Sequence, residues 1–256
     1  MPVVTAPVLG TPCWVDLSTS DLPGAINFYG RLLGWSFVDQ GADFGHYHMA
    51  AKNGHHAAGL GPMQPGGSPV PAWTVYIATA NVHQSVQQVT EHGGSVLAPP
   101  MDVGNHGRMA IVADPSGAVV GLWQALEHHG VGFRGEPGGL AWAEVNTRDG
   151  EGVAAFFSKL TGHTVQKMPE MAYWTLHTAD GQPHYGVLQM TTEWGDMPPH
   201  WMPYFAVASA DATAEKVVEL GGKVHHGPFD TPHGRILICA DPQGAAITFI
   251  QVPSQK

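Results

Sequence analysis

The sequence predicts an α+β fold in which two tandem copies of one domain form two curved mixed sheets from four βαβββ units. The first observation is an internal repeat, because residues 14–17 (WVDL) return as residues 142–145 (WAEV), an offset of 142 − 14 = 128. The second is that His-Gly-Arg at 106–108 and Asp-Pro at 114–115 return at 233–235 and 241–242. An offset held within one residue across most of each half indicates a duplication.

The elements of copy one follow in order from local signals. An alternating strand at 13–18 precedes Asp21, a good helix N-cap, and Pro23 falls in the first turn of a helix that stops at Gly34. The second helix carries Val82 and Val86 on one face and ends at the Gly-Gly pair at 93–94. The remaining strands are expected near 35–40, 44–52, 56–63, 73–79, 95–99, 107–113 and 118–124, with a Pro/Gly-rich loop at 64–71. Copy two repeats this order.

The segment between the copies predicts a linker. Residues 127–139 are rich in glycine and also contain a proline and charged side chains. We therefore expect one domain at residues 1–126 and a second at residues 140–256.

Composition limits the classes of function. Apolar residues make up 43% and charged residues 12% of the chain, which is typical of a globular protein. A formal net charge of -10 argues against binding to nucleic acid. No apolar run approaches the roughly 20 residues of a membrane span, and no signal peptide is expected. Cys13 and Cys239 are too few for a disulfide scaffold. We expect a cytoplasmic protein that is a monomer or a homodimer.

Short motifs recur in order in both copies: Asp21-Leu22, Phe28-Tyr29, Leu33-Gly34-Trp35 and Asp114-Pro115-Ser116-Gly117, then Asp149, Phe156-Phe157, Leu160-Thr161-Gly162 and Asp241-Pro242-Gln243-Gly244. This motif order resembles the vicinal oxygen chelate superfamily, which includes glyoxalase I, extradiol dioxygenases and bleomycin-binding proteins. The resemblance covers nearly the whole chain and is greatest to two-domain glyoxalase-like proteins, so it implies tandem glyoxalase-like domains.

The resemblance also implies where a metal would be held in metal-dependent members. One ligand lies on the first strand, one on the strand that opens the second unit, and one shortly after Asp-Pro-x-Gly. In this chain those positions fall on Trp14, Thr74 and Gly121 in copy one, and on Trp142, Met202 and Thr248 in copy two. None of them is His, Cys, Asp or Glu, the usual ligands of divalent metals. We therefore expect no metal and no cofactor.

Aromatic residues and carboxylates share the strand faces where those ligands would lie. Side chains two apart on a strand point to one face, so Trp14 is expected beside Asp16, and Trp142 beside Glu144. By the same spacing the face also receives Tyr76, Trp123 and Tyr204, with a gap at Gly121. Such a face suits a flat, mostly apolar ligand. A tryptophan on a strand face also commonly fills a core, and this alternative stays open for Trp14 and Trp142.

The repeated His-Gly-Arg triplet gives four further candidates. His106 and His233 are either rim residues that donate to a ligand or ordinary turn residues. Arg108 and Arg235 either contact the ligand or pair with Asp16 and Glu144 in a structural role.

Four functions compete on this basis. The leading hypothesis is metal-independent binding of a hydrophobic aromatic small molecule, such as an antibiotic or polyketide, for sequestration or self-resistance. The alternative is a metal-free isomerase, lyase or cyclase of secondary metabolism that uses Asp16 or Glu144 as acid or base. The third is a divalent-metal glyoxalase or dioxygenase with displaced ligands such as His46, His48 and His56. A scaffold that binds no ligand is also consistent with the sequence.

Overall fold

The computed structural model describes residues 4–252, and the strands of each copy form one mixed sheet of eight strands. Sheet 1 has the order β2-β3-β4-β1-β5-β8-β7-β6, and sheet 2 has the order β10-β11-β12-β9-β13-β16-β15-β14. The strands of sheet 1 are β1 (Pro12–Thr19), β2 (Ser36–Asp39), β3 (His48–Lys52), β4 (His55–Pro62), β5 (Ala72–Ala78), β6 (Ser95–Val103), β7 (Gly107–Ala113) and β8 (Val119–Ala125). Those of sheet 2 are β9 (Leu140–Thr147), β10 (Thr164–Lys167), β11 (Tyr173–His177), β12 (Pro183–Gln189), β13 (His200–Ala206), β14 (Lys223–Thr231), β15 (Gly234–Ala240) and β16 (Ala246–Gln251). The predicted α+β fold with four βαβββ units is confirmed.

One α-helix follows the first strand of each unit, and the sequence signals at its ends act as expected. The helices are α1 (Leu22–Leu33), α2 (Val82–Glu91), α3 (Gly150–Thr161) and α4 (Ala210–Glu219), with short 3-10 turns η1 (Ala42–Phe44) and η2 (Thr192–Trp194). The Asp21 carboxylate accepts a hydrogen bond from the Gly24 amide at 3.0 Å, and Asp149 does the same in α3. Gly34 ends α1 in the left-handed conformation at φ 72°, which glycine adopts without strain.

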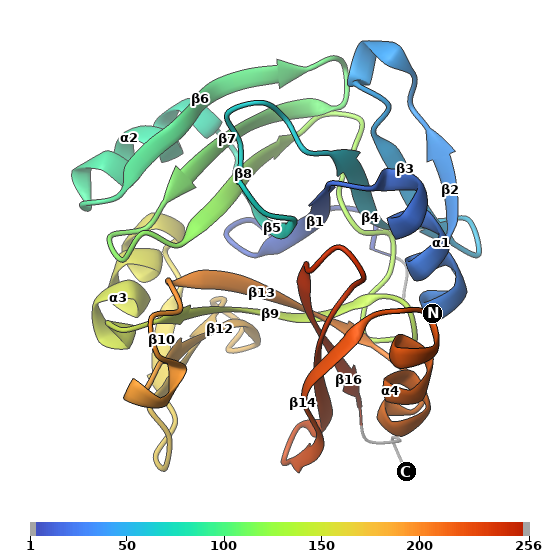
Figure 1. Cartoon of the computed structure of the whole chain (residues 1–256). Helices are drawn as coiled ribbons and strands as arrows, with labels where there is room; N and C mark the ends of the chain where they lie inside the picture. The colour runs from blue at the N-terminus through green and yellow to red at the C-terminus, as the bar shows by residue number, and fades with distance from the viewer. Residues whose placement is uncertain (1–3, 253–256) are drawn as a thin grey trace.

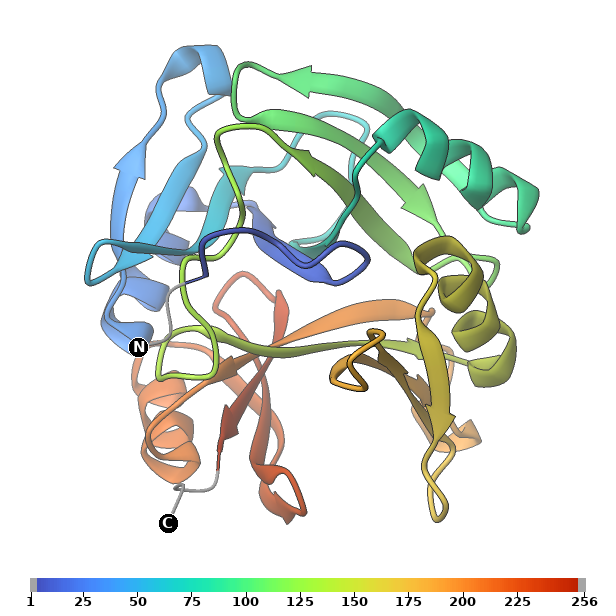
Figure 2. The same cartoon turned by 180° about the vertical axis from the view of Figure 1, so that it is seen from behind.

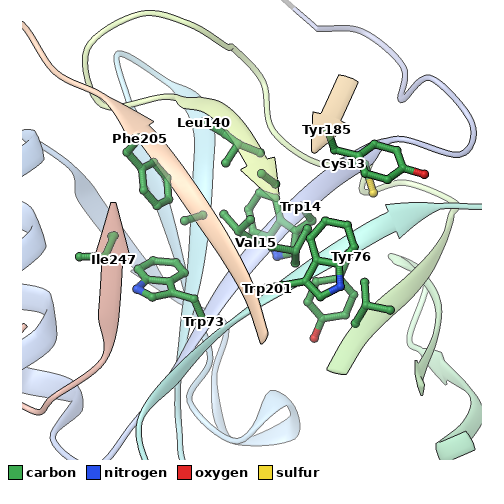
Figure 3. Packing of buried hydrophobic residues seen from close by; sticks show 14 of the residues in the cluster. Cys13, Trp14, Val15, Trp73, Tyr76, Leu140, Tyr185, Trp201, Phe205 and Ile247 are labelled. Carbon is green, nitrogen blue, oxygen red and sulfur yellow. The ribbon is translucent and has the colours of Figure 1, made fainter. Parts of the chain in front are cut away.

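The two sheets pack back to back and curve away from each other. Figure 1 shows β1 and β5 of sheet 1 facing β9 and β13 of sheet 2, while the outer strands bend outward. Helices lie at both sides of this interface, where α1 meets α4 and α2 meets α3. Trp73 of β5 contacts Phe205 of β13 with ring centroids 5.4 Å apart (Figure 3). Each sheet therefore buries its convex face against the other copy and turns its concave face outward.

A buried polar contact joins the copies beside these rings. The Tyr29 hydroxyl donates to Asp241 Oδ2 at 3.0 Å, and Trp73 Nε1 donates to the Tyr29 oxygen at 3.2 Å. Burial raises the pKa of Asp241. In the repeat, Phe157 occupies the position of Tyr29 and has no hydroxyl, and Asp114 Oδ2 is buried without a hydrogen-bond partner in residues 4–252. The aspartate of the Asp-Pro motif in copy two thus receives a hydrogen bond from copy one, whereas within residues 4–252 the corresponding Asp114 Oδ2 receives none from copy two.

The connection between the copies packs against both of them. Phe133 is completely buried, and Trp35 Nε1 donates to the Gly138 carbonyl at 2.8 Å. The Gly138 amide in turn donates to the Ala206 carbonyl of β13 at 2.8 Å. The segment predicted as a linker is therefore held by the core as well as by hydrogen bonds.

Two expectations about strands need correction. The predicted strand at 44–52 begins only at His48, because η1 and a left-handed turn at His46 (φ 58°) precede it. The predicted strand at 95–99 continues to Val103 and pairs with β7 along its length, with register shifts. In the described part of the chain, no helix is both long and apolar enough to cross a bilayer.

Replacing Tyr29 by phenylalanine is expected to lower the free energy of unfolding by about 1–3 kcal/mol, because it removes a buried donor and leaves Asp241 Oδ2 without its partner. Urea unfolding of the wild type, Tyr29→Phe, Asp241→Asn and the double variant measures the coupling between the two groups. Additive losses would show that the hydrogen bond does not contribute to joining the copies.

Candidate functional site

In copy one, a carboxylate on the concave face is held by two tyrosines. Asp16 of β1 lies opposite Thr74 of β5, and Trp14 lies opposite Tyr76, so all four share this face. The Tyr76 hydroxyl donates to Asp16 Oδ2 at 3.0 Å, and the Tyr47 hydroxyl donates to the same oxygen at 3.3 Å. Trp14 Nε1 donates to the Tyr47 oxygen at 2.9 Å, which fixes the second tyrosine.

Copy two repeats this network with glutamate in place of aspartate. The Tyr204 hydroxyl donates to Glu144 Oε1 at 2.7 Å, and the Tyr173 hydroxyl donates to Oε2 at 2.9 Å. Trp142 Nε1 donates to the Tyr173 oxygen at 2.9 Å. The structure thus brings together six of the predicted site residues in two networks, Trp14, Asp16 and Tyr76 in copy one and Trp142, Glu144 and Tyr204 in copy two.

Glycines make room for the tyrosines. A Cβ atom at Gly59 would lie 1.6 Å from the Tyr47 hydroxyl, and one at Gly186 would lie 1.9 Å from the Tyr173 hydroxyl. These two glycines pair with Asp16 and Glu144 on the neighbouring strand, so each tyrosine ring lies over a glycine to reach the carboxylate. The gap expected at Gly121 is likewise filled, because a Cβ there would lie 2.1 Å from the Tyr76 ring.

The two carboxyl groups have raised pKa values. Burial raises the pKa of Asp16 to about 7, and the hydrogen bonds from Tyr76 and Tyr47 oppose this rise. Burial also raises the pKa of Glu144, which is 6% exposed, again against its two tyrosine donors. Burial raises the tyrosine pKa values as well, so their hydroxyls stay protonated and remain donors at neutral pH.

Copy one carries a histidine from the connection on this face. The His128 ring contacts Trp14 edge-on with centroids 4.4 Å apart, and Trp123 Nε1 donates to the His128 carbonyl at 2.8 Å. Burial lowers the pKa of His128 to about 3, so the ring is neutral. Its Nε2 atom is buried without a partner in residues 4–252. His106 lies at this rim, because its carbonyl accepts from the His128 amide at 3.0 Å.

Copy two has an apolar patch instead. Met202, Tyr204 and Ile250 form a separate buried cluster on the concave face, with Trp142 and Ile236 packed against it. His233, the repeat of His106, is exposed. The two concave faces therefore share a network but differ in what surrounds it.

Arg108 and Arg235 do not pair with the carboxylates, which corrects that expectation. Arg108 Nε donates to Asp102 at 2.6 Å, and Arg235 binds Asp211 of α4 and Asp230 at 2.9–3.0 Å. Met109 pairs with Trp123 on the neighbouring strand, so Arg108 points to the opposite face. The same alternation of side chains along β15 places Arg235 on the face of sheet 2 that carries the helices.

The residues present do not fit a divalent metal. At the expected ligand positions of copy one, Trp14 offers an N–H donor that is already used, and the Tyr76 ring fills the space at Gly121. Thr248 Oγ1 in copy two is buried without a partner in the described chain, but one neutral hydroxyl does not hold such an ion. Within residues 4–252, no three His, Cys, Asp or Glu side chains converge on one point. His46 instead contacts Asp39 at 3.0 Å and lies outside the strand that contains His48.

Sequence reasoning missed Tyr47, Tyr173 and His128. The two tyrosines are 173 − 47 = 126 residues apart, so they fall two residues out of step with the repeat of 128. Two alignments of the copies, one before and one after the turn between the second and third strands, would have matched Tyr47 with Tyr173. Nothing in the sequence places His128 over Trp14, because it belongs to the connection.

Family models match both copies. The model of the glyoxalase/bleomycin resistance protein/dioxygenase superfamily matches residues 12–122, and that of the glyoxalase-like domain matches residues 142–250. The chain is 40% identical over 262 residues to "Putative glyoxylase CFP32" of Mycobacterium tuberculosis (strain CDC 1551 / Oshkosh), covering 96% of this chain and 97% of the relative. It is 35% identical over 264 residues to "Anthracycline biosynthesis protein DnrV" of Streptomyces peucetius, covering 95% and 94%.

The arrangement of the two sheets also occurs in a solved structure of low sequence identity. The Mn(II)-bound glyoxalase from Novosphingobium aromaticivorans superposes with a TM-score of 0.67 at 14% identity, covering 95% of this chain and 82% of that one. At this identity the likeness shows the fold alone. The family models and the 40% identical relative show that this chain belongs to the glyoxalase/bleomycin resistance protein/dioxygenase superfamily, with two glyoxalase-like domains.

Proposed function

We propose that the chain binds a hydrophobic aromatic small molecule on its concave faces without a metal. The observation that carries this proposal is the Trp–Tyr–carboxyl–Tyr network, which recurs in both copies on the strands where metal-dependent members hold their ligands. A carboxyl group with a purely structural role would have no reason to lie on the outward face of the sheet in both copies. Retaining this polar group twice among aromatic side chains favours a role in recognition.

The chemistry of each face suits such a ligand. Trp142 and Ile236 are partly exposed and provide apolar contact area next to Glu144. In copy one, the Nε2 atom of the neutral His128 ring has no partner among residues 4–252, and Asp16 is partly exposed. A flat ring system with hydroxyl or carbonyl groups at its edge would be bound by stacking and oriented by these polar atoms.

The relatives support an aromatic polyketide as the ligand class. Two of them, from Streptomyces peucetius and Streptomyces sp. (strain C5), are named as anthracycline biosynthesis proteins. An anthracycline is a flat, polycyclic aromatic molecule with hydroxyl and carbonyl groups. Sequestration or self-resistance is the use that follows for a binding protein of this class in the cytoplasm.

A metal-free acid–base enzyme is the second candidate, and one observation favours Asp16 over Glu144 for it. Both tyrosine hydrogen bonds in copy one fall on Asp16 Oδ2, whereas in copy two each oxygen of Glu144 receives one. With a pKa of about 7, Asp16 exchanges a proton readily at neutral pH. It would take a proton from an acidic carbon of a polyketide and return it elsewhere, as in an isomerase, lyase or cyclase, while the tyrosines stabilise its charged form.

Alanine at Trp14 or Trp142 is expected to weaken binding of an anthracycline by about tenfold or more, because Trp142 is a partly exposed contact surface and Trp14, which is buried in the core, holds Tyr47 in place. Isothermal titration measures the affinity, and native mass spectrometry shows whether the bound compound keeps its mass. Trp194→Ala is the control, since Trp194 belongs to neither network. Unchanged affinity in both network variants would contradict the proposed site. Chromatography of the released compound detects isomerisation, which leaves the mass unchanged, and conversion of either kind that persists in Asp16→Asn would remove Asp16 as the acid or base.

The stability of the protein is expected to fall between about pH 4 and pH 7 because of Asp16. Its pKa is about 7 in the folded chain and near 3.8 when unfolded, so over this range the folded state binds more protons. The contribution is complete below about pH 4 and lost above about pH 7, at most about 4 kcal/mol. Urea unfolding of the wild type and Asp16→Asn across this range should show a smaller slope in the variant. Parallel curves would mean that the Asp16 carboxyl titrates normally.

A further inference from the structure

A cavity of about 130 Å³ lies between the copies, away from both concave faces. It is bounded by the N-terminal segment, the start of β1, the connection and β12. In Figure 2 the N-terminal segment (blue) and the connection (yellow-green) run along the same side of the molecule, and the Val4 amide donates to the Gly132 carbonyl at 3.0 Å. The lining residues are Val4, Ala6, Pro7, Val8, Thr11, Pro12, Cys13, His129, Val131, Arg134 and His184.

Arg134 brings a positive charge to this cavity without a carboxylate to balance it. Its Nη2 atom donates to the Pro12 carbonyl, which uses one of several N–H donors of the guanidinium group. No aspartate or glutamate in residues 4–252 forms an ion pair with it. Arg134 is partly buried, and this burial lowers the pKa of its guanidinium group.

The neighbouring titratable groups do not supply the missing negative charge. Burial raises the pKa of the Cys13 thiol to about 12, so it stays protonated at neutral pH. His184 lines the cavity together with Arg134, and burial, His163 and Arg134 lower its pKa while Asp180 opposes this shift. His129 also lines the cavity and carries no negative charge in either protonation state. A partly buried arginine in a chain of net charge -10 is therefore left facing an open space.

The remaining walls select the kind of anion. Val4, Ala6, Pro7, Val8 and Val131 are apolar, so an occupant would meet hydrocarbon on several sides of the cation. A planar guanidinium matches a carboxylate with two parallel hydrogen bonds. We propose that this cavity binds a small organic carboxylate with a short hydrocarbon chain, and that Arg134 is its counter-ion. The bound anion would tie the N-terminal segment and the connection to copy two.

Butyrate and its uncharged amide, butyramide, form a matched pair of probes for this site. With ionic strength held constant by sodium chloride, butyrate at about five times its Kd should raise the Tm of the full chain by about 2–4 °C. Butyramide should leave the Tm unchanged, because it lacks the charge. Inorganic phosphate tests whether any anion suffices, and a larger rise with phosphate would overturn the assignment to a carboxylate.

Three variants locate the effect. Arg134→Gln should abolish the response to butyrate, whereas Arg31→Gln should keep it, since Arg31 pairs with Glu219 on the surface. Val8→Trp fills the cavity from an exposed position and should also abolish the response while leaving the basal Tm unchanged, which keeps the test valid if Arg134→Gln folds poorly. No rise in the wild type, or an equal rise in Arg134→Gln or Val8→Trp, would overturn the proposal.

Discussion

The packing of β5 against β13 is the contact on which the rest of the structure depends. A curved sheet with one apolar face must bury that face, and here the two copies bury their convex faces against each other through rings such as Trp73 and Phe205. This leaves both concave faces directed outward. The bond from Tyr29 to Asp241 lies in the same interface, so the Asp-Pro turn of copy two is fixed by a helix of copy one.

On each concave face, a carboxyl group is kept among aromatic rings at an energetic cost. Burying an ionised carboxylate is unfavourable unless it is hydrogen-bonded. Two tyrosine hydroxyls offset part of this cost, and the glycines at 59 and 186 are what allow the rings to reach the carboxyl. The part of the desolvation cost that these hydrogen bonds do not offset raises the pKa of Asp16, which can therefore donate or accept a proton near neutral pH.

The duplication kept this network and changed its surroundings. The connection exists only once, so its His128 lies against Trp14 in copy one. Copy two instead packs Met202 and Ile250 near Trp142. A single chain thereby presents two related faces with different chemistry.

The sequence by itself determined the duplication, the helix boundaries and the placing of aromatic residues beside Asp16 and Glu144. These follow from local rules, since N-caps such as Asp21 and the alternation of side chains along a strand act within a few residues. Only the tertiary structure decided which groups satisfy the carboxyls and which face Arg108 and Arg235 occupy. Tyr47 and Tyr173 come directly after a turn whose length differs between the copies, and the face that the arginines occupy depends on the register with neighbouring strands. Such contacts between distant segments are set by how the sheets pair and pack, because the free energy that selects them is gained only when the core closes.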